Sequence, residues 1–383
     1  MFKTYNNQAS RPAWVEIDLA QLRRNLEIIF NDKPDHLEIM SVVKNQAYGH
    51  GVIPITKIAL ESGVKYLAVA TIDEALELRQ KKISAPILIL GDRPSDQLEI
   101  CIKNNITCCI NDLDTAKKLS TLAIHYNAYI PIHIEIDTGM SRYGARWTEA
   151  LPLIESIAIL KGIFIEGIMS HFAMSDEKDK SYALLQIERF NSVLSGMKEK
   201  SIKVKYRHMC NTGGFLDLPQ AHYDMARIGI LVLGVYPSKA CRRIPGIKPV
   251  MSVKAKISTI RELQIGDKVG YGMRYEAESK RRIAVIPIGY GDGFPRIRNS
   301  GAVLIHGKRA SIIGGNAMDA MMVDITDIPE TQLWDEVVIM GKQEDEEINV
   351  DEIARLKNSI SYDILGGWSW RLPRVYLDKD PKK

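Results

Sequence analysis

The sequence predicts an α/β protein in two parts, an N-terminal (β/α)8 TIM-like barrel followed by a mostly β domain. The length of 383 residues suits two domains better than one. From residue 39 onward, short apolar runs alternate with longer amphipathic stretches, and after about residue 245 this rhythm gives way to alternating strands and turns. Repeated βα alternation is typical of a parallel barrel. We therefore expect the barrel over residues 1–245 and the β domain over residues 246–383.

Eight apolar, β-rich runs are the predicted barrel strands, because parallel strands buried on both faces are continuously apolar. They lie at 39–43, 66–70, 86–90, 107–110, 130–136, 163–170, 203–209 and 225–230. Helical patterns between them include 71–82, 112–123 and 179–200. Thr71 and Asp112 are expected N-caps, since each precedes such a pattern and an acidic residue follows soon after.

The second domain is predicted from segments whose apolar residues alternate with polar ones and which Gly, Asp and Lys turns separate. They are 250–263, 281–294, 302–315 and 335–343. Residues 11–19, ahead of the first helix at 21–30, are expected to pair with this β domain.

Composition excludes several classes of function. The 51 basic and 47 acidic residues are spread along the chain, so no basic arm predicts a nucleic-acid partner. No apolar run approaches the roughly 20 residues that cross a bilayer, and the N-terminus has no signal-peptide pattern. The five cysteines are odd in number and lack metal-ligand spacing. We therefore expect reduced, buried cysteines, a cytoplasmic protein, and no metal site.

The strongest chemical signal is the segment SVVKNQAYGHG at 41–51. Lys44 ends an apolar strand, which places it at the barrel rim where active sites assemble. A lysine partly withdrawn from water has a lowered pKa and is a better nucleophile toward a carbonyl. The alternative is an ordinary lysine that extends to solvent from a strand end. Gly49 and Gly51 favour a ligand site, because they let backbone approach a ligand closely, and Tyr48 is placed to reach a phosphate.

This segment resembles the cofactor-attachment motif of the alanine racemase family. Further matching segments follow in the family's order, from WVEIDLAQLRRNL to WRLPRVYL. The resemblance implies a barrel followed by a β domain, a head-to-tail homodimer, and pyridoxal 5'-phosphate held by Lys44 as a Schiff base. The implied reaction is racemisation of L- and D-alanine, which supplies D-alanine for cell-wall precursors in a bacterial host.

Racemisation is most simply done by two bases on opposite faces of the substrate's α-carbon. Lys44 is one candidate, and a tyrosine near cationic groups suits the other role. VGYGMRY (269–275) and PIGYGDGFPR (287–296) each place a tyrosine between glycines, although glycine in β turns is common. The resemblance makes Tyr271 the catalytic tyrosine and Tyr290 a substrate-pocket tyrosine. Both are expected to reach the partner subunit's barrel.

Arg227, Gly229 and Ile230 end the last predicted barrel strand. Loops at this place commonly bind phosphate through backbone N–H groups, which makes Gly229 and Ile230 candidate donors. From the sequence alone Arg227 has three possible roles: phosphate ligand, structural ion-pair partner, or partner of the cofactor's pyridine nitrogen. The resemblance selects the last, and it implies a relay from Tyr271 through His171 to Arg227.

The resemblance assigns further positions to the cofactor and substrate. Asn211 and Thr212 are implied at the cofactor, with Thr212 as the phosphate-binding hydroxyl. Arg142 is implied near the cofactor's phenolic oxygen and the substrate carboxylate. Met318 is expected to meet that carboxylate through its backbone N–H, followed in the sequence by Asp319.

Three positions depart from the family pattern. Glu135 stands where many members have a carbamylated lysine, and we expect its carboxylate to supply the same charge. Gly315 replaces an arginine of the substrate corridor, and Trp370 replaces a tyrosine. These changes bear on which amino acid is accepted more than on the type of reaction.

Three alternatives remain open. The first is a racemase of broader specificity, or one for serine or a basic amino acid, on the same site. A fold-related pyridoxal-phosphate decarboxylase predicts an acidic partner for the pyridine nitrogen, where this chain has Arg227. A non-enzymatic cofactor carrier would lack the second-domain tyrosines, Tyr271 and Tyr290.

Overall fold

The computed structural model describes residues 11–378 and divides the chain into two compact units. The barrel unit comprises residues 22–47 and 52–248. The β unit comprises, among the described residues, 11–21, 48–51 and 249–378.

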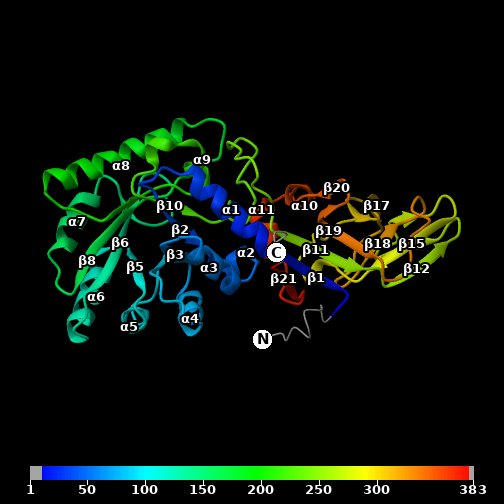
Figure 1. Ribbon diagram of the computed structural model, residues 1–383, viewed down its shortest axis with the longest axis horizontal. Helices are drawn as coiled ribbons and strands as arrows, with labels where there is room; N and C mark the ends of the chain where they lie inside the picture. Colours follow the sequence, from blue (N-terminus) through cyan, green and yellow to red (C-terminus); the bar gives the residue numbers. More distant parts are fainter. Residues whose placement is uncertain (1–10, 379–383) are drawn as a thin grey trace. The chain divides into compact units, whose positions relative to one another are not determined.

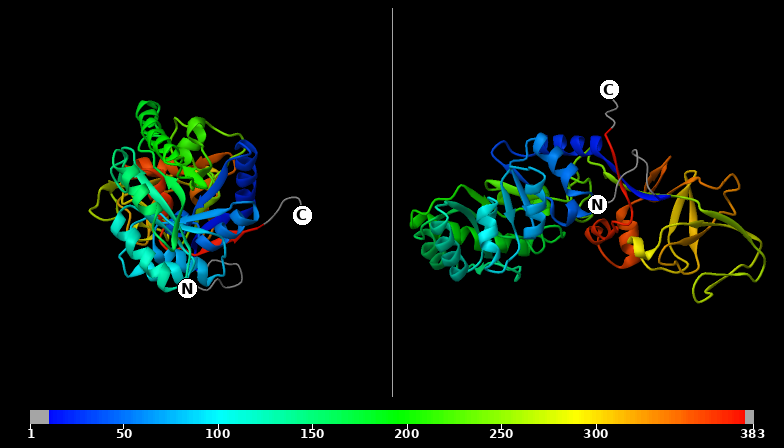
Figure 2. Two further views of the ribbon diagram at one scale, coloured as in Figure 1. Left: turned by 90° about the vertical axis from the view of Figure 1, so that its left-hand side faces the viewer. Right: turned by 90° about the horizontal axis from the view of Figure 1, so that it is seen from below.

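The barrel unit is a ring of parallel strands with helices outside it (Figure 1; Figure 2, left), as the sequence predicts. In chain order the strands are β2 (Glu38–Val42), β3 (Tyr66–Val69), β4 (Ile87–Ile89), β5 (Thr107–Ile110), β6 (Ile130–Asp137), β8 (Ile163–Met169), β9 (Tyr206–His208) and β10 (Met225–Ile228). From β2 to β9 each strand pairs with the next, β10 pairs with β2, and the two-residue β7 (Ala145–Arg146) pairs with β6. Between β9 and β10, the Asp224 N–H donates to the Arg207 carbonyl (3.0 Å) and the Arg227 N–H to the Cys210 carbonyl (2.9 Å), which closes the ring.

Helices connect the strands: α3 (Val52–Glu61), α4 (Ile72–Gln80), α5 (Gln97–Lys103), α6 (Leu113–His125), α7 (Ala150–Ala158), α8 (Ser181–Glu199), α9 (Thr212–Asp217) and the short η1 (Pro219–Ala221). The predicted helices at 71–82, 112–123 and 179–200 are confirmed as α4, α6 and α8. Both predicted N-caps are also confirmed. The Glu74 N–H donates to Thr71 Oγ1 (3.4 Å), and the Thr115 N–H donates to Asp112 Oδ1 (2.7 Å).

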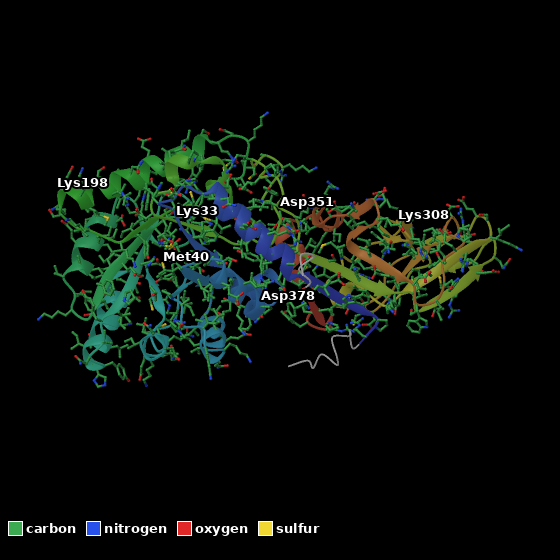
Figure 3. The ribbon with its side chains drawn as sticks, in the orientation of Figure 1. Lys33, Met40, Lys198, Lys308, Asp351 and Asp378 are labelled. Atoms are coloured by element: carbon green, nitrogen blue, oxygen red, sulfur yellow. The ribbon has the colours of Figure 1, made fainter. Side chains whose placement is uncertain are left out.

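Side chains fill the interior of the barrel, so it is a packed core. Met40 of β2 lies fully buried among the strands, whereas Lys198 near the end of α8 points to solvent (Figure 3). Ionisable side chains, among them His133, Glu135, His208 and Arg227, are also buried in this interior. Buried polar groups need partners, and the site described below contains them.

The β unit is a twisted, mostly antiparallel sheet of the order β12-β15-β18-β17-β16-β19-β11-β1-β21, with β20 paired to β19. Its strands are β1 (Ala13–Asp18), β11 (Met251–Lys256), β12 (Thr259–Leu263), β15 (Arg281–Ile286), β16 (Ala302–Ile305), β17 (Lys308–Ile313), β18 (Met321–Asp324), β19 (Glu336–Gln343), β20 (Glu346–Ile348) and β21 (Arg374–Leu377). A separate hairpin pairs β13 (Lys268–Val269) with β14 (Tyr275–Glu276). β1 lies between β11, which is antiparallel to it, and β21, which is parallel. From β1 the chain continues into α1 (Leu19–Asp32).

Two features of the β unit have no counterpart in the sequence analysis. Helices α10 (Val350–Lys357) and α11 (Ser361–Gly367) interrupt the otherwise β sequence. Residues 48–51 group with this unit, where the Tyr376 hydroxyl donates to the His50 carbonyl (3.1 Å) and Arg374 Nε to the Gly49 carbonyl (3.1 Å). None of the helices in residues 11–378 is both long and apolar enough to cross a membrane.

Candidate active site

The barrel brings the predicted barrel-side residues to one rim. In a parallel barrel all the carboxyl ends of the strands lie at the same end, where loops build the active site. Each of the following positions comes directly after a strand or in the loop beyond it: Lys44 after β2, Arg142 after β6, His171 after β8, Asn211 and Thr212 after β9, and Gly229 and Ile230 after β10.

Lys44 is partly buried, and the charges around it weaken its ammonium form. Burial lowers the pKa of Lys44, and the positive charges of Arg142 and Arg227 lower it further, while Glu74 opposes them. A lysine in this setting carries a larger fraction of neutral, nucleophilic amine than an exposed lysine.

The backbone that carries Lys44 has an unusual conformation. Strand β2 ends at Val42, and the segment α2 (Lys44–Tyr48) forms a left-handed turn with positive φ at Asn45, Gln46, Ala47 and Tyr48. For a residue other than glycine this conformation costs about 1–2 kcal/mol per residue. Such strain persists where surrounding contacts fix the chain, and it is frequent at active sites.

Arg227, in β10, donates hydrogen bonds from both of its terminal nitrogens. Nη1 donates to His208 Nδ1 (2.9 Å) and to the His208 carbonyl (3.1 Å). Nη2 donates to the Ser170 carbonyl (2.7 Å), His171 Nδ1 (3.0 Å) and the Met209 carbonyl (3.2 Å). Burial lowers the pKa of Arg227 to about 10, so it stays charged at neutral pH. Within residues 11–378, Nε donates none of these bonds, which makes it the group available to a ligand.

A row of polar side chains continues from Arg227 through the barrel interior. His208 Nε2 lies 2.8 Å from His133 Nδ1, and His133 Nε2 faces Glu166 Oε2 at 3.5 Å. The Tyr66 hydroxyl donates to the same Glu166 oxygen (3.1 Å). Burial opposes the ionisation of Glu166, but the contacts with His133, Tyr66 and Lys205 outweigh it and lower its pKa.

The charged groups at the two ends of this row, Arg227 and Glu166, determine which nitrogen of each histidine ring carries the proton. Because Arg227 only donates, His208 Nδ1 must accept, so His208 is neutral with its proton on Nε2. That N–H then donates to His133 Nδ1, which leaves the His133 proton on Nε2, facing the Glu166 carboxylate. Burial lowers the pKa of both histidines, in agreement with neutral rings.

His171 is fixed in the same way on the other side of Arg227. Its Nδ1 accepts from Arg227, so its proton lies on Nε2 and any group that meets Nε2 must accept a hydrogen bond. Burial, with Arg227, Arg142 and Lys44, holds the pKa of His171 well below its ordinary value. A neutral histidine that donates from Nε2 suits a phenolate or another acceptor.

Glu135, near the end of β6, is buried inside the barrel. The Cys109 thiol donates to its Oε2 (3.8 Å). Burial raises the pKa of Glu135, while the charges of Arg227 and Arg142 oppose that rise. The residue thus places a carboxyl group within electrostatic reach of both arginines, where the sequence analysis expects a charge.

The candidate phosphate ligands lie at two neighbouring loops. Thr212 is the first residue of α9 and is buried. Asn211 is the N-cap of that helix: its Oδ1 accepts from the Gly214 N–H (3.0 Å) and from the Ser175 hydroxyl (2.7 Å). Gly229 and Ile230 follow β10 directly. Tyr48 lies in the β unit, with its ring packed edge-on against Tyr362 at 6.0 Å between centroids.

The β unit gathers the other predicted residues in adjoining segments. The Gly291 N–H donates to the Met318 carbonyl (2.9 Å), and the Tyr290 N–H to the Ala317 carbonyl (3.2 Å). A side chain at Gly289 would meet the Ala317 carbonyl oxygen at 2.1 Å, so glycine is required for this approach. Asp319, beside Met318, forms an ion pair with Arg371 (2.5 Å).

Tyr271 lies on a short loop next to Gly315. Gly270 has φ +75°, and a Cβ there would meet the Gly315 carbonyl oxygen at 2.7 Å, so the two loops touch through glycine. Tyr271 is 70% exposed and Met318 is 51% exposed.

The departures from the family pattern can also be placed. A Cβ at Gly315 would lie 3.3 Å from the Tyr271 carbonyl oxygen, so Gly315 borders the candidate tyrosine. Trp370 is partly exposed, and the Arg374 guanidinium lies over its ring at 4.0 Å. Burial lowers the pKa of Arg374 to about 10.

The row formed by His208, His133 and Glu166 was not predicted from the sequence. Its only sequence signal is polar residues at alternate, inward positions of otherwise apolar strands, and such positions do not name their partners. Within residues 11–378 no group of His, Cys, Asp and Glu could hold a metal ion.

Comparison with known proteins finds two matching family descriptions that together cover most of the chain. The family described as "Alanine racemase, N-terminal domain" matches residues 17–237, and "Alanine racemase, C-terminal domain" matches residues 250–376. The chain belongs to the alanine racemase family. The family is in general dependent on pyridoxal phosphate.

Individual relatives cover the chain almost completely. The alanine racemase of Halothermothrix orenii is 40% identical and covers 98% of this chain and 99% of its own length. The structure of alanine racemase from Clostridium difficile 630 superposes with a TM-score of 0.92 at 35% identity, over 96% of each chain. The alanine racemase of Bacillus anthracis with bound L-Ala-P has a TM-score of 0.91 at 34% identity, over 99% of this chain and 97% of its own.

Proposed function

We propose that this protein interconverts L- and D-alanine with pyridoxal 5'-phosphate as cofactor. The observation that carries the proposal is one barrel rim with a lysine of lowered pKa and a buried, charged arginine whose Nε is available. Membership of the alanine racemase family supports the reaction type.

The donor set fits an anionic cofactor. Lys44, Arg142 and Arg227 are three cationic groups close enough for the arginines to lower the lysine's pKa. Such a cluster favours a ligand with a phosphate and a phenolate oxygen, and a substrate with a carboxylate. In the proposal Lys44 holds the cofactor covalently. Tyr48, Thr212 and the N–H groups of Gly229 and Ile230 bind its phosphate, with Asn211 capping the helix behind them.

When bound, pyridoxal phosphate withdraws electrons from the substrate and makes its α-proton acidic. Arg227 limits that effect, because a guanidinium with a pKa of about 10 does not readily pass a proton to the pyridine nitrogen. An amino-acid decarboxylase of this fold would be expected to place an acidic side chain there. Arg227 therefore favours racemisation over decarboxylation.

The two bases in the proposal are Lys44 and Tyr271 of the partner subunit. One takes the α-proton on its Nζ or phenolic oxygen, and the other gives a proton to the opposite face of the same carbon. The 70% exposure of Tyr271 supports a homodimer in which the β unit of one chain completes the barrel of the other. His171 then donates from Nε2 to the phenolate of the partner subunit's Tyr271. A cofactor carrier without a reaction would not need the second-domain tyrosines, Tyr271 and Tyr290.

On the substrate side, Arg142 and the N–H of Met318 of the partner subunit are proposed to bind the carboxylate. Tyr290 of the partner subunit and Asp319 of the partner subunit are proposed to lie at the mouth of the pocket. Glu135 supplies the negative charge that orients Arg142, so no carbamylated lysine is required. The five cysteines, free and buried, are in keeping with a cytoplasmic enzyme. The product D-alanine suits cell-wall precursor synthesis in a bacterial host.

One observation favours a second candidate, a racemase for a larger amino acid. The histidine racemase of Leuconostoc mesenteroides subsp. sake has a TM-score of 0.88 at 26% identity over 98% of this chain and all of its own. The fold therefore accommodates another substrate in that protein. Gly315, beside Tyr271, removes the bulk and charge that an arginine would place there.

Chiral chromatography on L-alanine, L-serine, L-lysine, L-arginine and L-histidine, with and without added pyridoxal phosphate, tests the proposal. We expect rapid inversion of alanine that depends on the cofactor. Faster inversion of another amino acid would favour the second candidate, a racemase for a larger substrate. No inversion of any of them by cofactor-loaded protein would refute it.

A further inference from the structure

The left-handed turn after Lys44 needs an external anchor. Asn45, Gln46, Ala47 and Tyr48 have φ between 50° and 53°, and none is glycine. Asparagine tolerates this region better than most residues, but alanine and tyrosine have no such tendency. The turn therefore persists because contacts around it fix the chain.

Helix α4 supplies that anchor. The Asn45 N–H donates to Glu74 Oε1 (2.5 Å), which ties the backbone of the turn to the helix. The Gln46 side chain donates to Glu77 Oε2 (2.5 Å), one turn further along the same helix. Both acidic residues thus face the turn, but only Glu74 binds its backbone.

The carboxylate of Glu74 is itself held rigidly. Its second oxygen, Oε2, accepts from the Ala70 N–H (2.7 Å) and the Thr71 N–H (3.2 Å), while the Glu74 N–H donates to Thr71 Oγ1 (3.4 Å). This is a capping box at the start of α4. One side chain therefore ties together the end of β3, the start of α4 and the residue next to Lys44.

We propose that Glu74 is a positioning residue for Lys44, acting through the backbone of Asn45. A capping glutamate needs one carboxylate oxygen for the start of its helix, and here the other oxygen accepts the hydrogen bond from the turn. The carboxylate also lies close enough to Lys44 to oppose the arginines that destabilise its ammonium form. Glu74 thus fixes the backbone from which the Lys44 side chain extends, and its negative charge partly restores the stability of the Lys44 ammonium form. The catalytic part of this inference rests on the proposed function.

The competing interpretation is that Glu74 only caps α4. Two matched variants separate these roles. Thr71→Ala removes the reciprocal half of the capping box and leaves the bond to Asn45. Glu77→Gln removes a carboxylate from the same helix face without touching the turn's backbone. In Glu74→Gln, the amide has one accepting oxygen, so it cannot serve both the helix start and Asn45.

Hydrogen–deuterium exchange of the cofactor-loaded, full-length protein is the first measurement, since it needs no activity. In Glu74→Gln we expect the amides of the peptide covering residues 43–48 to exchange at least severalfold faster. In Thr71→Ala and Glu77→Gln that peptide should exchange as in wild type, although Thr71→Ala should speed exchange at residues 72–75. Equal exchange of the 43–48 peptide in Glu74→Gln and wild type, or equal acceleration in Thr71→Ala, would overturn the proposal.

The second measurement is the pH dependence of cofactor attachment to Lys44, followed by absorbance after the cofactor is removed and added back. Loss of the Glu74 charge should move the acid limb of the attachment rate to lower pH by roughly 0.5–1 unit. The controls should not move it. An unchanged limb in Glu74→Gln would remove the electrostatic role. In the racemisation assay kcat should fall by about tenfold with KM little changed. If the wild type has no racemase activity the proposed function fails, while the exchange and attachment results still decide the role of Glu74.

Discussion

Arg227 Nη1 lies 2.9 Å from His208 Nδ1, and this contact fixes the direction of the hydrogen bonds beyond it. A guanidinium has no acceptor, so His208 Nδ1 must accept the bond from Arg227. His208 Nε2 then donates to His133 Nδ1, and the His133 Nε2 proton faces Glu166. The arginine at the candidate cofactor site is therefore tied to a carboxylate deeper in the barrel. This connection keeps two buried histidines neutral beside a permanent positive charge.

Nitrogen-15 NMR of histidine-labelled protein should show this proton order directly. We expect His133, His171 and His208 to give the pattern of neutral rings with the proton on Nε2, unchanged from pH 6.5 to 9. In Glu166→Ala the His133 ring loses its anchor, so its pattern should change or become mixed. His306, paired with Asp335 and 42% exposed in its side chain, is the exposed-ring reference in the same spectrum. A proton on Nδ1 of His208 in the wild type would contradict the assignment.

Stability should fall in mild acid because the fold holds His133 and His208, like His171, in the neutral form. Burial holds the pKa of His208 well below 6.5 and lowers that of His133, and both are completely buried. Below pH 6.5 the unfolded chain therefore binds protons that the folded chain does not, and folding stability decreases as pH falls. The slope approaches about 1.4 kcal/mol per pH unit for each histidine.

Urea unfolding at fixed protein concentration, between pH 8 and 5.5, measures this slope. The midpoint should be level from pH 8 to 7 and then decrease, before carboxylates titrate. A midpoint that stays constant down to pH 5.5 would show that these rings are protonated in the folded state or not buried.

Much of the fold was predictable because it depends on side-chain polarity along the chain. All eight barrel strands and both N-caps followed from apolar runs and capping residues. The left-handed turn did not, because Asn45–Tyr48 contains no glycine to indicate positive φ. The row from Arg227 to Glu166 also escaped, since His208 and His133 are 75 residues apart and only the closed barrel brings them together. The roles of Tyr271 and Arg142 come from the family resemblance.

Glu135 should work without carbon dioxide. Its carboxyl group is already present within reach of Arg142 and Arg227, so the intact mass should equal that of the unmodified chain and activity should not depend on bicarbonate. Glu135→Gln keeps the shape and removes the charge, and we expect KM for alanine to rise severalfold while the bound cofactor stays at wild-type level. A carbamate mass mapped near β6, or an unchanged KM, would contradict this role.

Lys44→Ala should lose the visible absorbance of the attached cofactor and nearly all activity, because no other residue is proposed to hold the cofactor covalently. Tyr271→Phe should retain the absorbance and lose most turnover, since phenylalanine has no group to exchange a proton. Full racemisation by Tyr271→Phe would remove this tyrosine from the mechanism. Tyr275→Phe is the matched control, since it makes the same change four residues along in the same VGYGMRY segment, at a tyrosine with no proposed role in the reaction.

Mixing these two inactive variants tests whether the site is shared between subunits. A dimer of one Lys44→Ala chain and one Tyr271→Phe chain has one site with both native residues, provided that Tyr271 acts on the partner's barrel. Random reassociation makes half of the dimers mixed, each with one active site of two, so activity should recover to about one quarter of wild type. If Tyr271 acted within its own chain, each site would lack one base and mixing would restore nothing. Recovery should also require subunit exchange, so unmixed stocks and mixtures assayed before exchange should stay inactive.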